Sequence, residues 1–461
     1  MRAPSWPSRE ARPGLSGLRR AHAIIAARPD NPLRHALYLL YNVLLALGFV
    51  LGLPWFLWKG RAGGKYFRTF RERMGRLPVY LNLDAERSIW IHAVSVGEVL
   101  AARPLVEALK ERFPSLRVFV STTTMTGNLV AQRSVRGADG LFYAPFDFAG
   151  PVRRALKTLN PALLVLIETE LWPNLIHEAH KCGSRVAMVN GRVSPRSFSR
   201  YLKIRRFLRR VLGEVDLFLM QAEPHATRVK ELGAPAERVF TTGNLKFDAL
   251  DAPRTPEKLA RVLAPAHGRA RPLWVAGSTV RGEEDLVLSA FHRVRERLPE
   301  TALVLAPRHP ERFSEVPGRI ESAGFRCRRR SAMEPGSWRD GEVVLLDTLG
   351  ELAQVYPLAT VVFVGGSLVP AGGHNILEAA VAGKPVLVGP HVENFQEIVE
   401  LFRREAAIVQ VDGAQALALE VTSLLQDELR RRTLGERARA LVLKHQGALA
   451  RTLDALAELV A

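Results

Sequence analysis

Cysteine is nearly absent from this chain, which contains only Cys182 and Cys327 in 461 residues. Two cysteines without a C-x-x-C pair cannot build a disulfide framework or a zinc finger. A disulfide-stabilised secreted fold is therefore excluded, and we expect a reducing compartment. His309 lacks a second ligand at a suitable spacing, and neither a P-loop nor a dinucleotide-binding fingerprint occurs. The sequence thus predicts neither a metal site nor a bound cofactor.

Acidic residues are also scarce, with 46 Asp and Glu against 65 Lys and Arg and a formal net charge of +19. This excess indicates anionic partners, namely nucleic acid, phospholipid headgroups or phosphorylated small molecules. Aromatic residues make up only 7% of the chain, and no aromatic-rich RNA-binding signature accompanies the basic residues. We therefore expect no nucleic-acid partner. The composition is otherwise typical of a globular protein with two or three domains.

A single apolar run stands out, residues 36–58, and it is long enough for one transmembrane helix. It is too long for the apolar part of a signal peptide, and no small-residue cleavage site follows it. We expect an uncleaved anchor helix, with a half-inserted or interfacial helix as the alternative. Residues 1–35 read as a disordered basic extension. Aromatic residues lie toward the ends of the run, as at membrane interfaces: Tyr38, Tyr41, Trp55 and Trp58.

From residue 88 onward, short apolar runs alternate with helical stretches, a pattern that indicates buried parallel strands. A first series of runs occupies residues 89–92, 118–121, 163–167, 186–190, 217–221 and 239–242. A second series occupies residues 273–276, 302–306, 343–346, 361–364, 386–388 and 408–411. The chain is therefore expected to be an α/β protein with two Rossmann-like domains, residues 59–248 and 272–430. A proline-containing linker, 249–271, would join them, and residues 431–461 would form terminal helices.

Ligands of open α/β sheets bind at the carboxyl ends of strands, which selects three sites in the first series. Glu98 follows the first run, although a carboxylate there would also favour the dipole of the next helix. Glu168 and Glu170 follow the third run and suit acid/base chemistry. Lys246 follows the last run, where a structural salt bridge with Asp248 is the alternative.

In the second series, small or basic residues follow the strands. A turn containing Ser278 and Thr279 precedes a helix and forms a candidate phosphate site, as many α/β loops do. Arg308 offers a fork of donors between two prolines. A glycine segment, residues 365–378, leads into a helix expected to carry Asn375 and Glu378 in its first turn. Such a loop suits phosphate and such a glutamate suits ribose hydroxyls, so the segment points to a nucleotide-sugar site, with Gly366, Gly373 and His374 as further phosphate candidates.

These segments together resemble the bacterial Kdo (3-deoxy-manno-octulosonic acid) transferases of lipopolysaccharide assembly. The resemblance extends from about residue 39 to residue 456 and rests on six segments in the same order: 92–98, 168–174, 244–248, 307–310, 350–352 and 365–378. It implies the GT-B fold, two domains facing a central cleft, and attachment to the cytoplasmic face of the inner membrane. It also implies inverting transfer of Kdo from CMP-Kdo to lipid IVA, the lipid A precursor.

The resemblance also implies roles for individual residues. Glu98 matches the catalytic base, and Glu168 and Lys246 match residues that stabilise the transition state. CMP contacts are matched by Pro307, Arg308, Leu349, Gly350, Glu351, Asn375, Ile376, Leu377 and Glu378. Leu349 departs from the methionine of close relatives, but a backbone contact there would survive. The absence of a D-x-D motif agrees with metal-independent transfer. The alternatives are a GT-B transferase or epimerase acting on a UDP-sugar, and a membrane-bound binding protein with an inactive GT-B fold.

The stretch from 194 to 212 predicts one amphipathic helix. Its apolar positions are Tyr201, Ile204, Phe207, Leu208 and Val211, and its basic positions are Arg200, Lys203, Arg205, Arg206, Arg209 and Arg210. The basic face is either simply solvated or meets an anionic membrane and the phosphates of the lipid acceptor.

Overall fold

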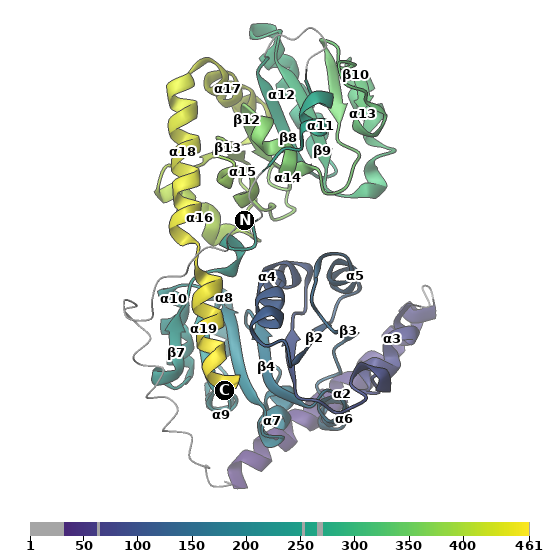
Figure 1. Cartoon of the computed structure of the whole chain (residues 1–461), viewed down its shortest axis with the longest axis vertical. Helices are drawn as coiled ribbons and strands as arrows, with labels where there is room; N and C mark the ends of the chain where they lie inside the picture. The colour runs from purple at the N-terminus through teal and green to yellow at the C-terminus, as the bar shows by residue number, and fades with distance from the viewer. Residues whose placement is uncertain (1–31, 62–64, 251–253, 265–270, 461) are drawn as a thin grey trace. The chain divides into compact units, whose positions relative to one another are not determined.

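Two parallel sheets organise the chain, as a computed structural model of residues 32–61, 65–250, 254–264 and 271–460 shows (Figure 1). The chain divides into an N-terminal unit, residues 1–249 with 446–461, and a C-terminal unit, residues 250–445. Most of the expected basic extension, residues 1–31, lies outside the described residues. The two α/β units expected from the sequence are confirmed.

The sheet of the N-terminal unit is entirely parallel, with the order β3-β2-β1-β4-β5-β6-β7. Its strand order reverses between β1 and β4, where ligands of such sheets bind. The strands are β1 (Ser88–His92), β2 (Arg117–Thr122), β3 (Gly140–Tyr143), β4 (Pro161–Ile167), β5 (Arg185–Gly191), β6 (Leu217–Met220) and β7 (Val239–Thr241).

The C-terminal unit repeats this plan with the order β10-β11-β9-β8-β12-β13-β14, again all parallel. Here the strand order reverses between β8 and β12. The strands are β8 (Leu273–Thr279), β9 (Ala302–Pro307), β10 (Arg326–Arg329), β11 (Glu342–Leu345), β12 (Val361–Val364), β13 (Val386–Val388) and β14 (Val409–Gln410).

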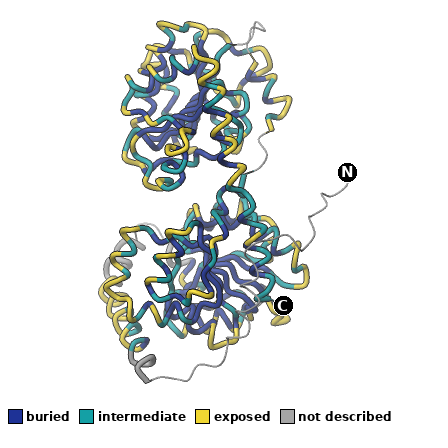
Figure 2. The backbone as a smooth tube through the Cα atoms, turned by 90° about the vertical axis from the view of Figure 1, so that its left-hand side faces the viewer, coloured by how far each residue is buried: buried dark blue, intermediate teal, exposed yellow. Residues whose placement is uncertain are grey.

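Helices cover both faces of each sheet, and the strands lie in the buried middle of each unit (Figure 2). In the N-terminal unit they are α2 (Pro32–Arg61), α3 (Lys65–Arg73), α4 (Val96–Arg112), α5 (Met125–Ser134), α6 (Ala149–Leu159), α7 (Pro173–Lys181), α8 (Pro195–Leu202), α9 (Arg205–Gly213), α10 (Glu223–Leu232) and α19 (Ala448–Val460). In the C-terminal unit they are α11 (Glu257–Val262), α12 (Glu283–Arg297), α13 (Val316–Ser322), α14 (Leu352–Val355), α15 (Leu377–Val381), α16 (Gln396–Arg404), α17 (Gly413–Gln426) and α18 (Glu428–His445).

Alternate residues of β1 show how each sheet builds a core on both faces. Trp90 belongs to one hydrophobic core cluster together with residues of α6, α7, α9 and α10, whereas Ile89 and Ile91 belong to another together with residues of α4 and α19. All three side chains are fully buried because successive residues of a strand point to opposite faces. Strands buried on both faces explain the continuous apolar runs of the sequence.

Two strands have no counterpart in the sequence prediction. Both β3 and β10 are short edge strands, and β10 has the sequence Arg-Cys-Arg-Arg. An edge strand pairs on one side only and tolerates charge, which explains the arginines of β10, whereas β3 is an apolar run of only four residues, Gly-Leu-Phe-Tyr. The expected linker contains the short helix α11, and the expected terminal helices separate: α18 packs in the C-terminal unit and α19 in the N-terminal unit (Figure 1).

The apolar run 36–58 forms part of α2, a helix of 30 residues. No helix within the described residues is long and apolar enough to cross a membrane. The expectation that Tyr38 and Tyr41 are interfacial aromatics is wrong, since Tyr38 is buried and the Tyr41 hydroxyl donates to Asp147 at 2.7 Å. The side chains of Trp55 and Trp58 lie outside the described part of the chain.

The predicted helix at 194–212 is broken in two, α8 and α9, with the break at Lys203 and Ile204. Ile204 is 50% exposed, because it precedes α9 and does not continue the apolar stripe. Leu208 and Val211 are buried as expected.

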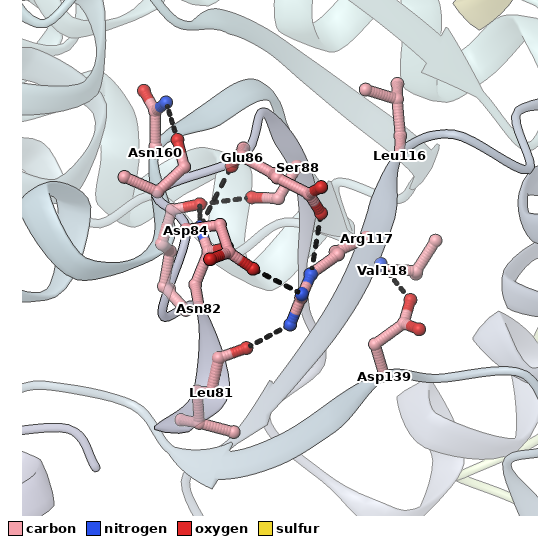
Figure 3. A network of polar contacts seen from close by, with 12 residues as sticks. Leu81, Asn82, Asp84, Glu86, Ser88, Leu116, Arg117, Val118, Asp139 and Asn160 are labelled. Atoms are coloured by element: carbon pink, nitrogen blue, oxygen red, sulfur yellow. Dashed lines mark hydrogen bonds and ion pairs between the residues drawn. The ribbon is translucent and has the colours of Figure 1, made fainter. Parts of the chain in front are cut away.

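A polar network closes the amino ends of β1, β2 and β4, opposite the expected site (Figure 3). Arg117 pairs with Glu86 at 2.9 Å and donates to the carbonyl of Leu81 at 3.1 Å. Ser88 Oγ donates to the carbonyl of Leu159 at 2.6 Å. These contacts satisfy strand and loop ends among themselves, which leaves the carboxyl ends of the strands for chemistry.

Candidate active site

Glu98 lies in the first turn of α4, directly after β1, and its residue is 7% exposed. Its carboxylate accepts from the N–H of Val94 and from the Ser95 hydroxyl, both at 2.7 Å. The Ser95 hydroxyl oxygen accepts in turn from the N–H of Glu98 and so caps the helix. Burial, helped by the nearby charges of Glu170 and Glu168, raises the pKa of Glu98 to about 7, although its two hydrogen bonds act in the opposite direction. Glu98 therefore both stabilises the start of α4 and titrates near neutral pH.

Glu168 directly follows β4 and has a φ of 59°. This left-handed conformation costs a non-glycine residue about 1 kcal/mol or more, which its backbone offsets by donating to the carbonyl of Val189 at 2.8 Å. Lys246 Nζ lies 3.0 Å from Glu168 Oε1. The alternative pairing with Asp248 is wrong, because that carboxylate accepts from the N–H groups of Gly447 and Leu449 at the start of α19.

Glu170 and Trp172 complete this group of side chains. Trp172 Nε1 donates to Glu170 Oε2 at 2.7 Å, and the Trp172 ring meets His92 edge-on at a centroid distance of 4.7 Å. Burial lowers the pKa of His92 to about 3, so its ring is neutral, with Nδ1 2.9 Å from the hydroxyl of Ser121. Glu170 was expected from the sequence to suit acid/base chemistry together with Glu168, whereas Trp172 was given no role.

Glu98 and Glu168 therefore flank the reversal of strand order between β1 and β4. Three carboxylates share this neighbourhood with one lysine: Glu168 pairs with Lys246, whereas burial raises the pKa of both Glu98 and Glu170. A carboxylate that titrates near neutral pH is suited to take a proton from a hydroxyl group.

In the C-terminal unit, Ser278 and Thr279 do not form the expected turn. Strand β8 continues through Thr279, with a register shift beside Gly277 and a φ of 55° at Ser278. The carbonyl of Thr279 accepts from the N–H of Arg308 at 2.8 Å, which ties the end of β9 to β8. The bulge therefore positions the backbone of Arg308.

Glu283, which the sequence gave no role, occupies the centre of the expected phosphate loop. Its fully buried carboxylate accepts four backbone N–H groups, from Val280 at 3.0 Å, Gly366 at 2.6 Å, Ser367 at 2.8 Å and Leu368 at 2.7 Å. The expectation that Gly366 donates to a phosphate therefore fails, because its N–H is already used by an internal anion. Glutamate here satisfies donors that a glycine loop would otherwise offer to a ligand.

Arg308, His374 and Glu378 share one neighbourhood around the buried Tyr356. Burial and the nearby Arg308 and His309 lower the pKa of His374 to about 4, so its ring is neutral. Burial and Glu378 raise the pKa of Tyr356, against Arg308. The His374 ring lies against Gly366, where a Cβ would come within 2.8 Å of its Nε2. A side chain on Gly366 would therefore displace the histidine.

The helix expected to carry Asn375 begins two residues later, at Leu377. Asn375 lies ahead of it and accepts from the N–H of Leu377 at 3.1 Å, whereas Glu378 is in the first turn. Ile376 and Leu377 are fully buried, so their side chains belong to the core of the unit.

The loop at 349–351 lies before α14. Glu351 accepts from Arg330 at 3.0 Å and from the Thr348 hydroxyl at 2.5 Å, and Gly350 has a φ of 83°. Leu349 is 66% exposed. No group of three or more metal-binding side chains is found in the described part of the chain.

Comparison with known proteins agrees with this geometry. Residues 68–249 match the family model of 3-deoxy-D-manno-octulosonic-acid transferases, and residues 284–441 match that of group 1 glycosyl transferases. The chain is 36% identical to the 3-deoxy-D-manno-octulosonic acid transferase of Haemophilus influenzae, over 85% of this chain and 91% of that protein. It is 37% identical to the enzyme of Bordetella pertussis, over 89% and 97%.

A solved UDP-GlcNAc 2-epimerase from Neisseria meningitidis covers 81% of this chain and 100% of its own, with a TM-score of 0.56 at 14% identity. This likeness concerns the fold alone and supports the expected GT-B architecture of two α/β units. The sequence relatives, in contrast, match 85% and 89% of this chain at 36% and 37% identity, so the match extends over both units. The chain therefore belongs to the bacterial Kdo transferases, the glycosyltransferases that add Kdo in lipopolysaccharide biosynthesis.

Proposed function

We propose that this enzyme transfers Kdo from CMP-Kdo to lipid IVA, with Glu98 as the general base. The observation that carries the proposal is the buried Glu98 carboxylate, which has a pKa of about 7 and lies near Glu168, the partner of Lys246. A sugar hydroxyl is a poor nucleophile and needs a base as the new bond forms. Mass spectrometry of the product from purified enzyme, CMP-Kdo and lipid IVA tests the proposal and counts the Kdo units added.

The remaining residues take complementary roles in the proposed mechanism. Lys246, held by Glu168, supplies positive charge near the reacting sugar, and Arg308 supplies it for the departing cytidylate phosphate. Glu378 suits the ribose hydroxyls, and the exposed backbone at Gly350 suits the remainder of CMP. If UDP displaces a bound donor analogue more strongly than CMP does, the alternative of a UDP-sugar enzyme replaces this proposal.

Transfer is expected to keep its full rate in excess EDTA. The proposed charge stabilisation comes from Arg308 and Lys246, and the acidic side chains around Glu98 pair with protein groups at distances of 2.7–3.0 Å. Initial rates with and without chelator provide the measurement, with magnesium added back to the chelated sample. Loss of activity that magnesium restores would contradict metal-independent transfer.

We further propose that the N-terminal unit rests on the anionic inner membrane. One face of α2 packs on the unit, and the other is apolar and exposed, at Leu39, Leu40, Val43, Leu44, Leu47, Val50 and Leu51. Tyr41 of α2 stacks with Phe207 of α9 at 5.7 Å, so the basic residues of α9 lie close to α2. An apolar face beside arginines is the combination that binds anionic lipid surfaces.

Replacing Arg205, Arg206 and Arg209 together with glutamate is expected to raise the KM for lipid IVA several-fold while leaving that for CMP-Kdo unchanged. All three side chains are exposed, and each basic residue near an anionic surface contributes roughly 1 kcal/mol at low salt. Vesicle sedimentation across a salt series measures the binding directly. The matched control replaces three exposed arginines elsewhere in the same unit, Arg112, Arg133 and Arg136. If the two triple variants have the same KM for lipid IVA and bind vesicles equally well, the basic side chains of α9 are merely solvated.

A further inference from the structure

The inner face of α2 is polar, in contrast to its apolar outer face. Tyr38, Tyr41 and Asn42 are spaced so that they share one side of the helix. All three contact side chains of the N-terminal unit, although the run that contains them reads as a plain apolar segment. Membrane attachment alone does not require a helix face that forms hydrogen bonds with the protein.

Asp147, in the loop before α6, links α2 to the start of α7. Its Oδ2 accepts from the Tyr41 hydroxyl at 2.7 Å and from the N–H of Asn174 at 3.1 Å, and its Oδ1 accepts from the N–H of Leu175 at 2.8 Å. Asp147 therefore caps α7 from a distant part of the chain, and Tyr41 holds the cap in place. Burial raises the pKa of this carboxyl to about 7, although its three hydrogen bonds act in the opposite direction.

Asn42 and Asn174 form a second link through their side-chain amides. Asn174 Nδ2 donates to Asn42 Oδ1 at 2.9 Å, and Asn42 Nδ2 donates to Asn174 Oδ1 at 3.3 Å. Asn174 is 1% exposed, so its amide depends on protein partners. Each asparagine thus fixes the orientation of the other.

A third link lies one turn further along α7. The ring of Tyr38 stacks on His177 at 4.2 Å, and the Tyr38 hydroxyl donates to Glu214 at 3.0 Å. Glu214 also lies 3.0 Å from His177 Nδ1. Asn174 and His177 are three residues apart and lie on the same side of α7, so α2 contacts one face of the first turns of α7.

Helix α7 begins at Pro173, directly after the segment 168–172. That segment carries Glu168, which pairs with Lys246, and Glu170, which Trp172 holds by a hydrogen bond. No residue separates Trp172 from the helix, so a shift of the first turn of α7 would displace the segment. The contacts between α2 and α7 therefore affect the positions of the side chains that surround Glu98.

We propose that the polar face of α2 positions the segment 168–172 for catalysis, with Tyr41 and Asn42 as positioning residues that act through Asp147 and Asn174. The inference rests on the proposed function, because it assigns catalytic roles to Glu98, Glu168 and Lys246. The helix that meets the membrane then also sets the geometry of the acceptor-side site. A displacement of about 1 Å at such a site lowers rates by up to about 100-fold.

The test uses Tyr41→Phe and Asn42→Ala in the full-length enzyme, assayed in detergent so that vesicle binding plays no part. Tyr41→Phe keeps the ring beside Phe207 and removes only the hydroxyl on Asp147. We expect kcat to fall about 10-fold in each variant, with the KM values for CMP-Kdo and lipid IVA unchanged. The acid limb of the kcat–pH profile should also move to lower pH, because Glu168 and Glu170 would lie further from Glu98. Tyr80→Phe, at a tyrosine that is 73% exposed, is the matched control.

Transfer by the wild-type enzyme establishes the proposed function independently of these variants. If the wild type transfers Kdo and both variants keep their kcat within about twofold, the positioning role is overturned while the proposed function stands. It is equally overturned if kcat falls only in proportion to the folded fraction, with the pH profile unmoved, because α2 then contributes to stability alone.

Discussion

Replacing Glu98 with alanine is expected to lower kcat about 10²–10⁴-fold while leaving the affinity for CMP nearly intact. The Glu98 carboxylate belongs to the N-terminal unit and has a pKa raised to about 7, whereas the proposed CMP contacts all belong to the C-terminal unit. Removing a general base therefore acts on the chemical step and not on nucleotide binding. Single-turnover kinetics and calorimetric titration with CMP measure the two quantities separately.

Glu111→Ala is the control, since this exposed glutamate belongs to the same helix, α4, and should leave the rate unchanged. A Glu98→Ala enzyme that keeps more than about half of the wild-type turnover would remove the base assignment. Weakened CMP binding in the same variant would instead indicate that the substitution disturbs the fold of the unit.

The wild-type rate should also fall on acidification through a pH of about 7. A base works only when deprotonated, and burial raises the pKa of Glu98 to about 7, so the active fraction declines below that pH. An exposed glutamate would lose activity near pH 4. This acid limb is part of the same prediction and is absent from Glu98→Ala.

Replacing Glu283 with alanine is expected to destabilise the C-terminal unit by at least about 3 kcal/mol, because four backbone donors lose their acceptor inside the protein. For a domain of this size the melting temperature should fall by roughly 10 °C. Glutamine does not rescue the loop fully. Each carboxylate oxygen accepts two N–H groups, and the amide nitrogen of glutamine would confront two donors.

Differential scanning calorimetry measures the stability change, and CMP titration shows whether the loop at 365–378 keeps its shape. Asp285→Ala is the matched control, since this exposed acid lies in the same turn of α12 and forms only a surface pair with Arg319. Surface pairs contribute about 0–1 kcal/mol. If Glu283→Ala melts within about 2 °C of the wild type and binds CMP equally well, the four hydrogen bonds do not hold the loop.

The sequence by itself determined the two α/β units and most of the strands. A parallel strand buried on both faces must be apolar throughout, so β4 and β12 are visible as continuous runs. The rule that ligands meet the carboxyl ends of strands then selected Glu98, Glu168 and Arg308 before any contact was known. The edge strand β10 was not predicted, because one unpaired side releases it from the apolar requirement, as its arginines show.

Only the tertiary structure decided which partner each polar group takes. Lys246 lies next to Asp248 in sequence but pairs with Glu168, 78 positions away, because β4 and the loop after β7 end at the same edge of the sheet. The N–H of Gly366 looked free for phosphate until folding brought Glu283 against it from 83 positions away. In the sequence, Tyr41 and Asn42 are minor interruptions of an apolar run, and only the structure shows that they form hydrogen bonds with Asp147 and Asn174. The local sequence pattern predicts whether a residue is buried, because burial follows the periodicity of its own helix or strand. The hydrogen-bond partner of a residue, in contrast, comes from a segment that meets it only after the chain has folded.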